Sequence, residues 1–184
     1  MASKRWVIAG GGTGGHVTPA LALGEALRER GDEVLFVGSA RGLESKLVPG
    51  AGFELEMLPS EQFMGRNLLG RLRGALSILR STWIARKTLK RFRADAVLSV
   101  GGYAAMPAAV AAWLTRRPLF LVEPNAIPGR VNRLTARFAR VVFVGFEATR
   151  GSLPEKTQSL CVGVPLRQAL YRAFADRPEK GVPR

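Results

Sequence analysis

The sequence is short of several residue types, and each shortage excludes a class of protein. Its single cysteine, Cys161, excludes an internal disulfide and fits a reducing cytoplasm. With one histidine, His16, the chain lacks a Cys/His metal cluster, and we expect neither a metal site nor a Ser-His-Asp triad. The longest apolar stretch, residues 104–114, contains Pro107 and is shorter than the roughly 20 residues of a membrane span. No secretory signal is visible.

Acidic residues are also scarce. The chain has 14 of them against 28 lysines and arginines, a net charge of +14 over 184 residues. Such an excess predicts an anionic partner, either nucleic acid, a phospholipid surface or a phosphorylated substrate. A general compositional bias is the alternative explanation.

Apolar runs alternate with helical patterns along the chain, and the runs are continuous, as in parallel strands covered on both faces. The pattern predicts an α/β fold with a doubly wound parallel sheet. We expect one domain over residues 1–170, followed by a linker or a cut end over 171–184. The expected strands are residues 6–9, 33–37, 54–58, 96–100, 119–122, 141–144 and 159–162. The expected helices are residues 18–30, 43–49, 68–92, 104–114, 128–138 and 167–174.

A glycine-rich loop, Gly10 to His16, follows the first expected strand and precedes a helix. Glycines permit sharp turns and close approach of a ligand, and a helix N-terminus favours phosphate. The spacing matches the dinucleotide fingerprint, but the second strand ends without the acidic residue that binds ribose. A Walker loop is excluded because no lysine follows the glycines. His16, in the first helical turn, is a candidate functional side chain or a structural helix-terminus residue.

Further polar residues follow the other strands. In a parallel sheet these loops meet at one edge, where ligands bind. They include Tyr103 after a glycine pair, Glu123 and Asn125, and Arg167. Together they predict a polar site for a phosphorylated or hydroxylated ligand. Each also has a structural interpretation, since glycines form turns and Glu123 or Asn125 could cap a helix.

The segment from residue 66 to residue 93 carries nine basic residues and no acidic one. Its apolar residues recur at helical spacing on one face: Leu69, Leu72, Leu76, Leu79 and Trp83. Three interpretations are open. The leucine stripe packs on the sheet beneath a solvated charged face, or the helix lies on an anionic membrane, or it binds nucleic acid. The last is the weakest, because no nucleic-acid module is present.

These residues resemble the N-terminal half of the MurG family, peripheral membrane glycosyltransferases of bacterial peptidoglycan synthesis. The similarity runs from about residue 6 to about residue 170. It rests on residues 11–16, on Gly101-Gly102-Tyr103, on Glu123 and Asn125, and on Gly163, Pro165 and Arg167. The resemblance implies a Rossmann-like N-terminal domain of a GT-B enzyme, with the active site in the cleft between two domains. The second domain, which supplies most donor contacts, is absent from this sequence.

The resemblance also implies roles for individual residues. His16 is the candidate catalytic base and contacts the acceptor. The implied donor-binding residues are Thr13, Gly14, Gly15, Asn125 and Arg167. The implied acceptor-binding residues are Gly12, His16, Gly101, Gly102, Tyr103 and Glu123. The implied membrane residues are Leu72, Leu76, Leu79, Arg80 and Trp83.

The implied reaction is inverting transfer of N-acetylglucosamine from UDP-N-acetylglucosamine to lipid I, giving lipid II, with no cofactor or metal. The partners are then both substrates, an anionic inner-membrane surface and the missing domain or a separate donor subunit, but no nucleic acid. The implied location is peripheral, on the cytoplasmic face of the bacterial membrane. We expect the isolated chain to be inactive. A stand-alone subunit of a split glycosyltransferase and a non-catalytic nucleotide-binding module are the alternatives.

The sequence departs from the family pattern at four positions. Val122 and Pro124 replace the histidine and the glutamine of the family's His-Glu-Gln-Asn segment. Val164 replaces the asparagine of its Gly-Asn-Pro segment, and Ala105 stands where the family commonly has a small hydroxyl residue. Each change removes a polar group from the expected rim of the site, and Pro124 also removes a backbone N–H.

Overall fold

One parallel sheet forms the centre of the computed structural model, which describes residues 3–59 and 68–175. Its seven strands lie in the order β3-β2-β1-β4-β5-β6-β7, and every neighbouring pair is parallel. This confirms the predicted doubly wound α/β fold and all seven expected strands. The bounds are β1 Arg5–Gly10, β2 Glu33–Ser39, β3 Glu54–Leu58, β4 Ala96–Gly101, β5 Leu119–Glu123, β6 Val141–Val144 and β7 Ser159–Cys161.

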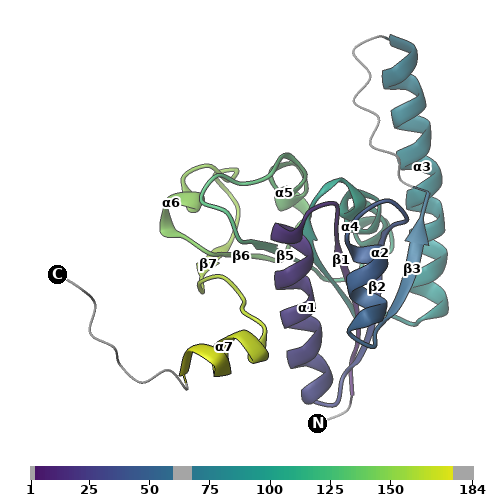
Figure 1. Ribbon diagram of the computed structural model, residues 1–184. Coiled ribbons are helices and arrows are strands. Elements are labelled where there is room, and N and C mark those ends of the chain that lie inside the picture. Colours follow the sequence, from purple (N-terminus) through teal and green to yellow (C-terminus); the bar gives the residue numbers. More distant parts are fainter. Residues whose placement is uncertain (1–2, 60–67, 176–184) are drawn as a thin grey trace.

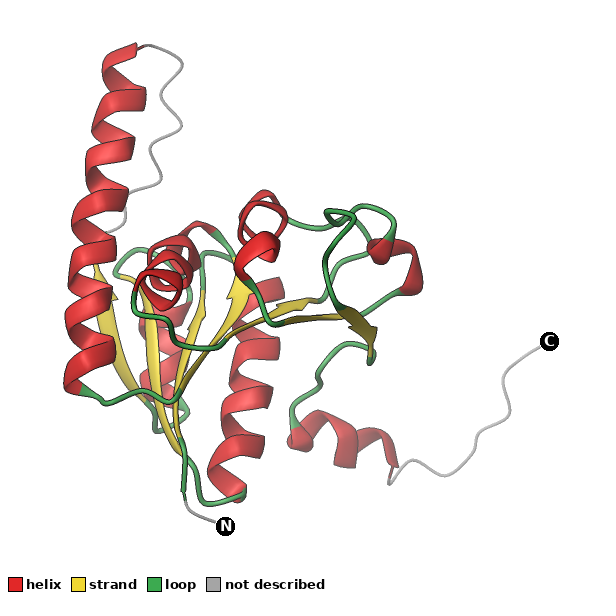
Figure 2. Cartoon of the chain, turned by 180° about the vertical axis from the view of Figure 1, so that it is seen from behind, coloured by secondary structure: helices red, strands yellow, loops and turns green. Residues whose placement is uncertain are grey.

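Helices cover both faces of the sheet. Helices α1 (Gly14–Glu29) and α2 (Glu44–Gly50) lie on one face, toward the viewer in Figure 1. Helices α3 (Leu68–Arg91), α4 (Met106–Leu114) and α5 (Arg130–Thr135) lie on the other, which Figure 2 shows from behind. The remaining helical elements are η1 Tyr103–Ala105, η2 Ala136–Phe138, α6 Glu147–Arg150 and α7 Gln168–Ala175.

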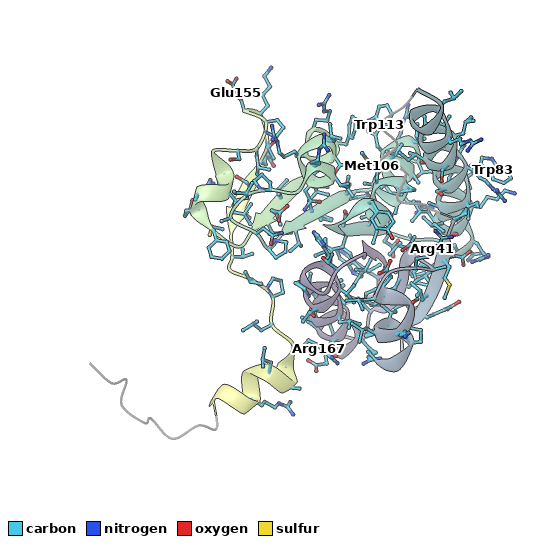
Figure 3. All side chains as sticks on the ribbon, turned by 45° about the horizontal axis from the view of Figure 1, so that its top comes forward. Arg41, Trp83, Met106, Trp113, Glu155 and Arg167 are labelled. Carbon is cyan, nitrogen blue, oxygen red and sulfur yellow. The ribbon has the colours of Figure 1, made fainter. Side chains whose placement is uncertain are left out.

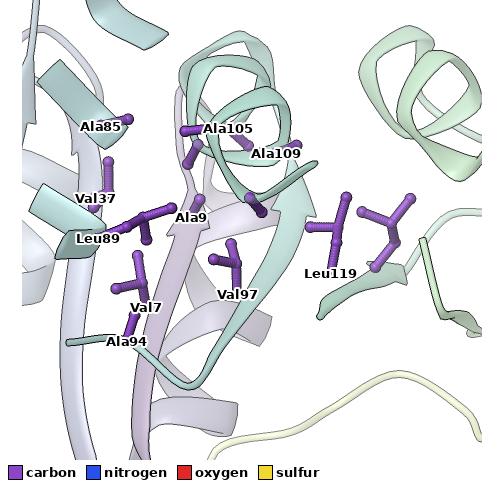
Figure 4. Close-up of a cluster of buried hydrophobic side chains, with 14 of the residues drawn as sticks. Val7, Ala9, Val37, Ala85, Leu89, Ala94, Val97, Ala105, Ala109 and Leu119 are labelled. Carbon is purple, nitrogen blue, oxygen red and sulfur yellow. The ribbon is translucent and has the colours of Figure 1, made fainter. Parts of the chain in front are cut away.

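Alternate strand residues build two separate cores. Val7 and Ala9 of β1 face the alanine-rich helix α4 and the C-terminal half of α3 (Figure 4). Ile8, between them in sequence, points to the opposite side of the sheet. There it packs with Leu21 of α1 and Phe36 of β2. Because successive strand side chains point to opposite faces, continuous apolar runs are what a sheet buried on both sides requires.

Helix α3 packs against the domain through a face other than its leucine stripe. The side chains buried against the domain belong to its C-terminal half, and apart from Leu89 they are small or polar: Ser81, Thr82, Ala85 and Thr88. Small residues allow a close approach to α4, which presents Ala105, Ala108 and Ala112. The interpretation in which the leucine stripe packs on the sheet is therefore wrong, and Leu79 of that stripe is 66% exposed.

The ends of several elements differ from the expected ones. Helix α1 begins at Gly14, inside the glycine loop, rather than at residue 18. Helix α6 was not expected, and α7 runs across the expected domain end at residue 170. Residues 176–184 of the expected linker lie outside the described residues.

Candidate functional site

Two glycine loops meet where the order of the strands reverses. The chain runs from β1 outward to β3 and then returns to β4 on the other side of β1, and ligands bind such sheets at this point. Gly10 at the end of β1 pairs in register with Gly101 at the end of β4. A Cβ on Gly102, which has a φ of +82°, would lie 2.1 Å from the carbonyl oxygen of Gly11. The two loops therefore touch backbone to backbone, and a side chain at position 102 would separate them.

His16 stands in the first turn of α1, and its backbone oxygen would lie 3.7 Å from a Cβ on Gly10. Its Nδ1 lies 3.0 Å from Oγ1 of Thr13, the residue that precedes the helix. Partial burial lowers the pKa of His16, and the nearby Glu123 carboxylate opposes this effect. The imidazole is therefore neutral at pH 7. When Nδ1–H donates to Thr13, Nε2 carries a free lone pair and can accept a proton.

Tyr103 joins the two loops to strand β2. Its ring lies over Gly12, where a Cβ would be 3.1 Å from Cε1, and the φ of Gly12 is +92°. Its hydroxyl oxygen is 3.1 Å from Oγ of Ser39 at the end of β2. The structure thus brings together five of the residues expected at the acceptor: Gly12, Gly101, Gly102, Tyr103 and His16.

Glu44, whose buried carboxylate lies beneath the loops, was not predicted from the sequence. Oε2 accepts a hydrogen bond of 2.9 Å from the Gly12 N–H. Oε1 accepts hydrogen bonds from Ser39, 2.9 Å from the backbone N–H and 2.8 Å from Oγ. The acid that was missing from the end of the second strand thus comes from α2, but it is fully buried and cannot bind a ribose. Its signal in the sequence was the two glycines that precede it, Gly38 and Gly42.

Glu123 at the end of β5 is a second fully buried carboxylate. Oε1 accepts from the backbone N–H of Asn125 at 2.9 Å and from its Nδ2 at 2.8 Å. Oε2 accepts from the Gly129 N–H at 2.8 Å and from Nδ2 of Asn132 at 3.0 Å. Four internal donors use both oxygens, so Glu123 shapes the β5–α5 loop and holds Asn125 in place. Asn132, which the sequence analysis also missed, contributes from α5.

Arg167 is not brought to the glycine loops. Its Nε donates to Oε1 of Glu25 at 3.0 Å, and its Nη2 contacts the same oxygen. This hydrogen bond raises the pKa of Arg167. At 1.5 Å per residue, Glu25 lies about 13 Å further along α1 than His16. Of the expected donor-binding residues, Thr13, Gly14 and Gly15 form the start of α1 and Asn125 follows β5, while Arg167 is held apart from them (Figure 3).

The part of the exposed leucine stripe that precedes residue 80 lies at the same edge of the sheet as the loops, whereas Trp83 stands on the half of α3 that packs against the domain. Leu72, Leu76 and Trp83 are 58%, 57% and 57% exposed. The N-terminal half of α3 projects beyond the sheet on the side where the strands end (Figures 1 and 2). The basic residues Arg73, Arg80, Arg86 and Lys87 of this helix are exposed too, and Nζ of Lys87 lies 3.5 Å from the centre of the Trp83 ring.

Two further observations concern the part of the chain that the structure describes. None of its helices combines the length and the hydropathy needed to cross a bilayer. No group of three or more histidine, cysteine, aspartate or glutamate side chains in residues 3–59 and 68–175 is placed to hold a metal ion.

Solved structures and curated sequences provide an independent comparison. The structure of MurG from Acinetobacter baumannii superimposes with a TM-score of 0.75 and 31% identity, covering 95% of this chain and 50% of that one. A putative UDP-N-acetylglucosamine 2-epimerase from Listeria monocytogenes, at a TM-score of 0.62 and 16% identity, shares the fold over 83% of this chain and 42% of its own.

Two curated relatives are named UDP-N-acetylglucosamine--N-acetylmuramyl-(pentapeptide) pyrophosphoryl-undecaprenol N-acetylglucosamine transferase. The protein from Alkalilimnicola ehrlichii is 49% identical over 90% of this chain, and the one from Anaeromyxobacter dehalogenans is 42% identical over 98%. The matches span 45% and 48% of those relatives, so the chain covers about half of their length. Residues 6–144 match the glycosyltransferase family 28 N-terminal domain, and the chain belongs to this family.

Proposed function

We propose that this chain is the acceptor- and membrane-binding half of an inverting N-acetylglucosaminyltransferase. The enzyme moves N-acetylglucosamine from UDP-N-acetylglucosamine to the sugar of lipid I and so makes lipid II. The observation that carries the proposal is the position of His16 and the two touching glycine loops beside the exposed stripe of α3. A ligand with a lipid tail and a diphosphate can reach both features from one side. The relatives' names, which describe this transfer, support the choice of substrates.

The proposed chemistry is a single displacement. The acceptor hydroxyl oxygen bonds to the anomeric carbon of the donor sugar while the bond from that carbon to the diphosphate breaks, and UDP leaves. Nε2 of His16 takes the hydroxyl proton, and Oγ1 of Thr13 holds the ring by accepting a hydrogen bond from Nδ1–H. Gly14 and Gly15 begin α1, so their backbone N–H groups have no partner within the helix and suit phosphate oxygens.

The remaining substrate-binding residues keep their expected roles in this proposal, except that the roles of Glu123 and Arg167 change. Gly12, Gly101, Gly102 and Tyr103 line the acceptor position, whereas Glu123 acts through the loop that presents Asn125 to the donor sugar. Arg167 must leave Glu25 before its guanidinium can reach a donor diphosphate. The domain of residues 1–170 then binds the acceptor, and residues 171–184 are the proposed linker.

The membrane part of the proposal places the stripe of α3 on an anionic bilayer. Leu72, Leu76, Leu79 and Trp83 enter the interface, while Arg80 and its basic neighbours contact lipid phosphates. The enzyme is then peripheral, on the cytoplasmic face of the bacterial membrane. The strand ends and the loops face the bilayer, which supplies lipid I directly.

Donor binding requires the other half of the enzyme. We expect no transfer of labelled N-acetylglucosamine to lipid I by residues 1–184 alone. A fusion of this chain to the second half of the Alkalilimnicola ehrlichii relative should transfer it, and a mixture of the two separate parts tests the split-enzyme alternative. Transfer by the chain alone would contradict the assignment of a half-site. A nucleotide-binding module without transfer activity predicts an inactive fusion that still binds UDP-N-acetylglucosamine.

A further inference from the structure

The buried carboxylate of Glu44 has no place in the proposed chemistry, yet it contacts two loops directly and a third through Ser39. We propose that Glu44 is the positioning residue of the site. It clamps the loop after β1 to the loop after β2, and through Ser39 it fixes the hydroxyl of Tyr103 from the loop after β4. The kinetic part of this proposal rests on the proposed function, while the structural part does not.

Glycines make room for the Glu44 side chain on three sides. A Cβ on Gly11 would lie 2.2 Å from Oε1, one on Gly38 would lie 2.6 Å from Cγ, and one on Gly42 would meet Oε2 even more closely. None of these three glycines has a positive φ, so backbone conformation does not explain them. Their shared property is that each leaves space for one carboxylate.

Glu44 engages one backbone N–H group of the glycine loop and leaves two others unengaged. The N–H of Gly12 points down to Oε2 at 2.9 Å and is therefore not available to a ligand. The N–H groups of Gly14 and Gly15, at the start of α1, remain for phosphate oxygens. Glu44 thereby fixes the orientation of the loop and keeps its ligand-binding donors on the opposite side.

A second connection runs from Glu44 to Tyr103. Oε1 accepts the Ser39 hydroxyl proton at 2.8 Å, so the Ser39 oxygen is oriented to accept from the Tyr103 hydroxyl at 3.1 Å. The Tyr103 ring is then held over Gly12. A change at Glu44 should accordingly alter acceptor binding through Tyr103 as well as through Gly12.

The first experiment needs no enzymatic activity. Amide hydrogen exchange of the 184-residue chain is compared for the unsubstituted protein, Glu44→Gln and Glu54→Gln, a matched loss of charge at an exposed position of β3. We expect faster exchange at the Gly12 and Ser39 amides in Glu44→Gln only, because a glutamine presents one oxygen where two acceptors are needed. Unchanged exchange at Gly12 would overturn the proposal.

The second experiment uses the fusion enzyme described above. In Glu44→Gln we expect kcat/KM for the lipid acceptor to fall about 10- to 100-fold, which is the size of effect that corresponds to the loss of one hydrogen bond to a charged group. The KM for UDP-N-acetylglucosamine should change much less. Ser39→Ala, which leaves the Gly12 bond in place, should give a smaller fall and should be non-additive with Tyr103→Phe. Rates are expressed per folded molecule, so a variant that merely folds less well shows unchanged constants.

Normal constants in the folded Glu44→Gln enzyme would reduce Glu44 to a structural residue and overturn the proposal, even if exchange at Gly12 had increased. An unsubstituted fusion without any transfer would count against the proposed function alone. In that case the exchange measurement and acceptor binding by the isolated chain still test the clamp, with a short-chain prenyl diphosphate as the probe. Equal affinity of Glu44→Gln and Glu54→Gln for this probe would overturn it.

Discussion

Membrane binding by α3 can be tested by reversing one apolar and one basic contact. The variant is Leu76→Glu with Arg80→Glu, two exposed side chains one turn apart on the projecting half of the helix. Neither side chain is among those buried against the domain, so the fold should be retained. The two changes alter the charge of the surface by −3 in total, −1 at Leu76 and −2 at Arg80.

The expected size of the effect follows from exposure and charge. Burying a leucine stabilises by about 1.5–3 kcal/mol in full. Since Leu76 is 57% exposed, its insertion contributes about 1–1.5 kcal/mol. Each charge at an anionic surface adds about 1 kcal/mol, so three charge units add about 3 kcal/mol. The sum of about 4 kcal/mol corresponds to a roughly 10³-fold weaker partition coefficient.

Flotation with vesicles of phosphatidylglycerol and of phosphatidylcholine measures this partition. The matched control is Leu170→Glu with Arg172→Glu on α7, which carries the same charge change far from α3 (Figure 1). We expect the control to bind anionic vesicles nearly as well as the unsubstituted chain, and binding to fall with salt because it is partly electrostatic. Equal binding by the two variants would refute the assignment of α3 as the membrane surface.

Four further outcomes are expected. In the fusion enzyme, His16→Ala should lower turnover about 10²- to 10⁴-fold if His16 is the base, and a near-normal rate would make it a structural residue. Burial lowers the pKa of His16, so kcat/KM should stay high at neutral pH and fall only below pH 6.5, the ordinary histidine pKa. The lowered pKa of His16 also makes the free energy of unfolding decrease as the pH drops below 6.5, because the unfolded chain then binds more protons than the folded one. In urea unfolding, His16→Ala should lack this part of the pH dependence. Gly102→Ala should destabilise by several kcal/mol and Gly163→Ala by only about 1 kcal/mol in urea unfolding, since both have a φ near +80° but only Gly102 lacks space for a Cβ. Equal losses would show that strain, not loop contact, governs position 102.

The fold could be predicted because a parallel sheet buried on both faces leaves a strong pattern. Uninterrupted apolar runs such as residues 119–122 have few other structural explanations, and the glycine pair Gly101-Gly102 marked where another strand ends. The position of α3 could not be derived in the same way. Its most apolar stripe was the natural choice for the core, but the alanines of α4 select the small residues Ser81 and Ala85 as the packing face.

The residues that hold the site were harder to find than those that line it. Gly12, His16 and Tyr103 lie within recognisable motifs, whereas Glu44 and Asn132 lie on helices and reach the loops only in three dimensions. Arg167 shows the opposite case. Its motif predicts a donor contact, but nothing in the sequence indicates that Glu25, 142 positions earlier, holds the guanidinium.

The two buried carboxylates explain how loops made largely of glycine can keep a defined shape. Glycine has no side chain with which to anchor a loop, and it loses the most conformational freedom on folding. Glu44 anchors the loop after β1 from one side of the strand reversal, and Glu123 anchors the loop after β5 from the other. Each carboxylate is buried and accepts hydrogen bonds from backbone N–H groups of the protein. Neither carboxylate is therefore exposed to a ligand. The proposal that a diphosphate binds at the first loop therefore rests on the backbone N–H groups of Gly14 and Gly15 at the start of α1, which neither carboxylate engages.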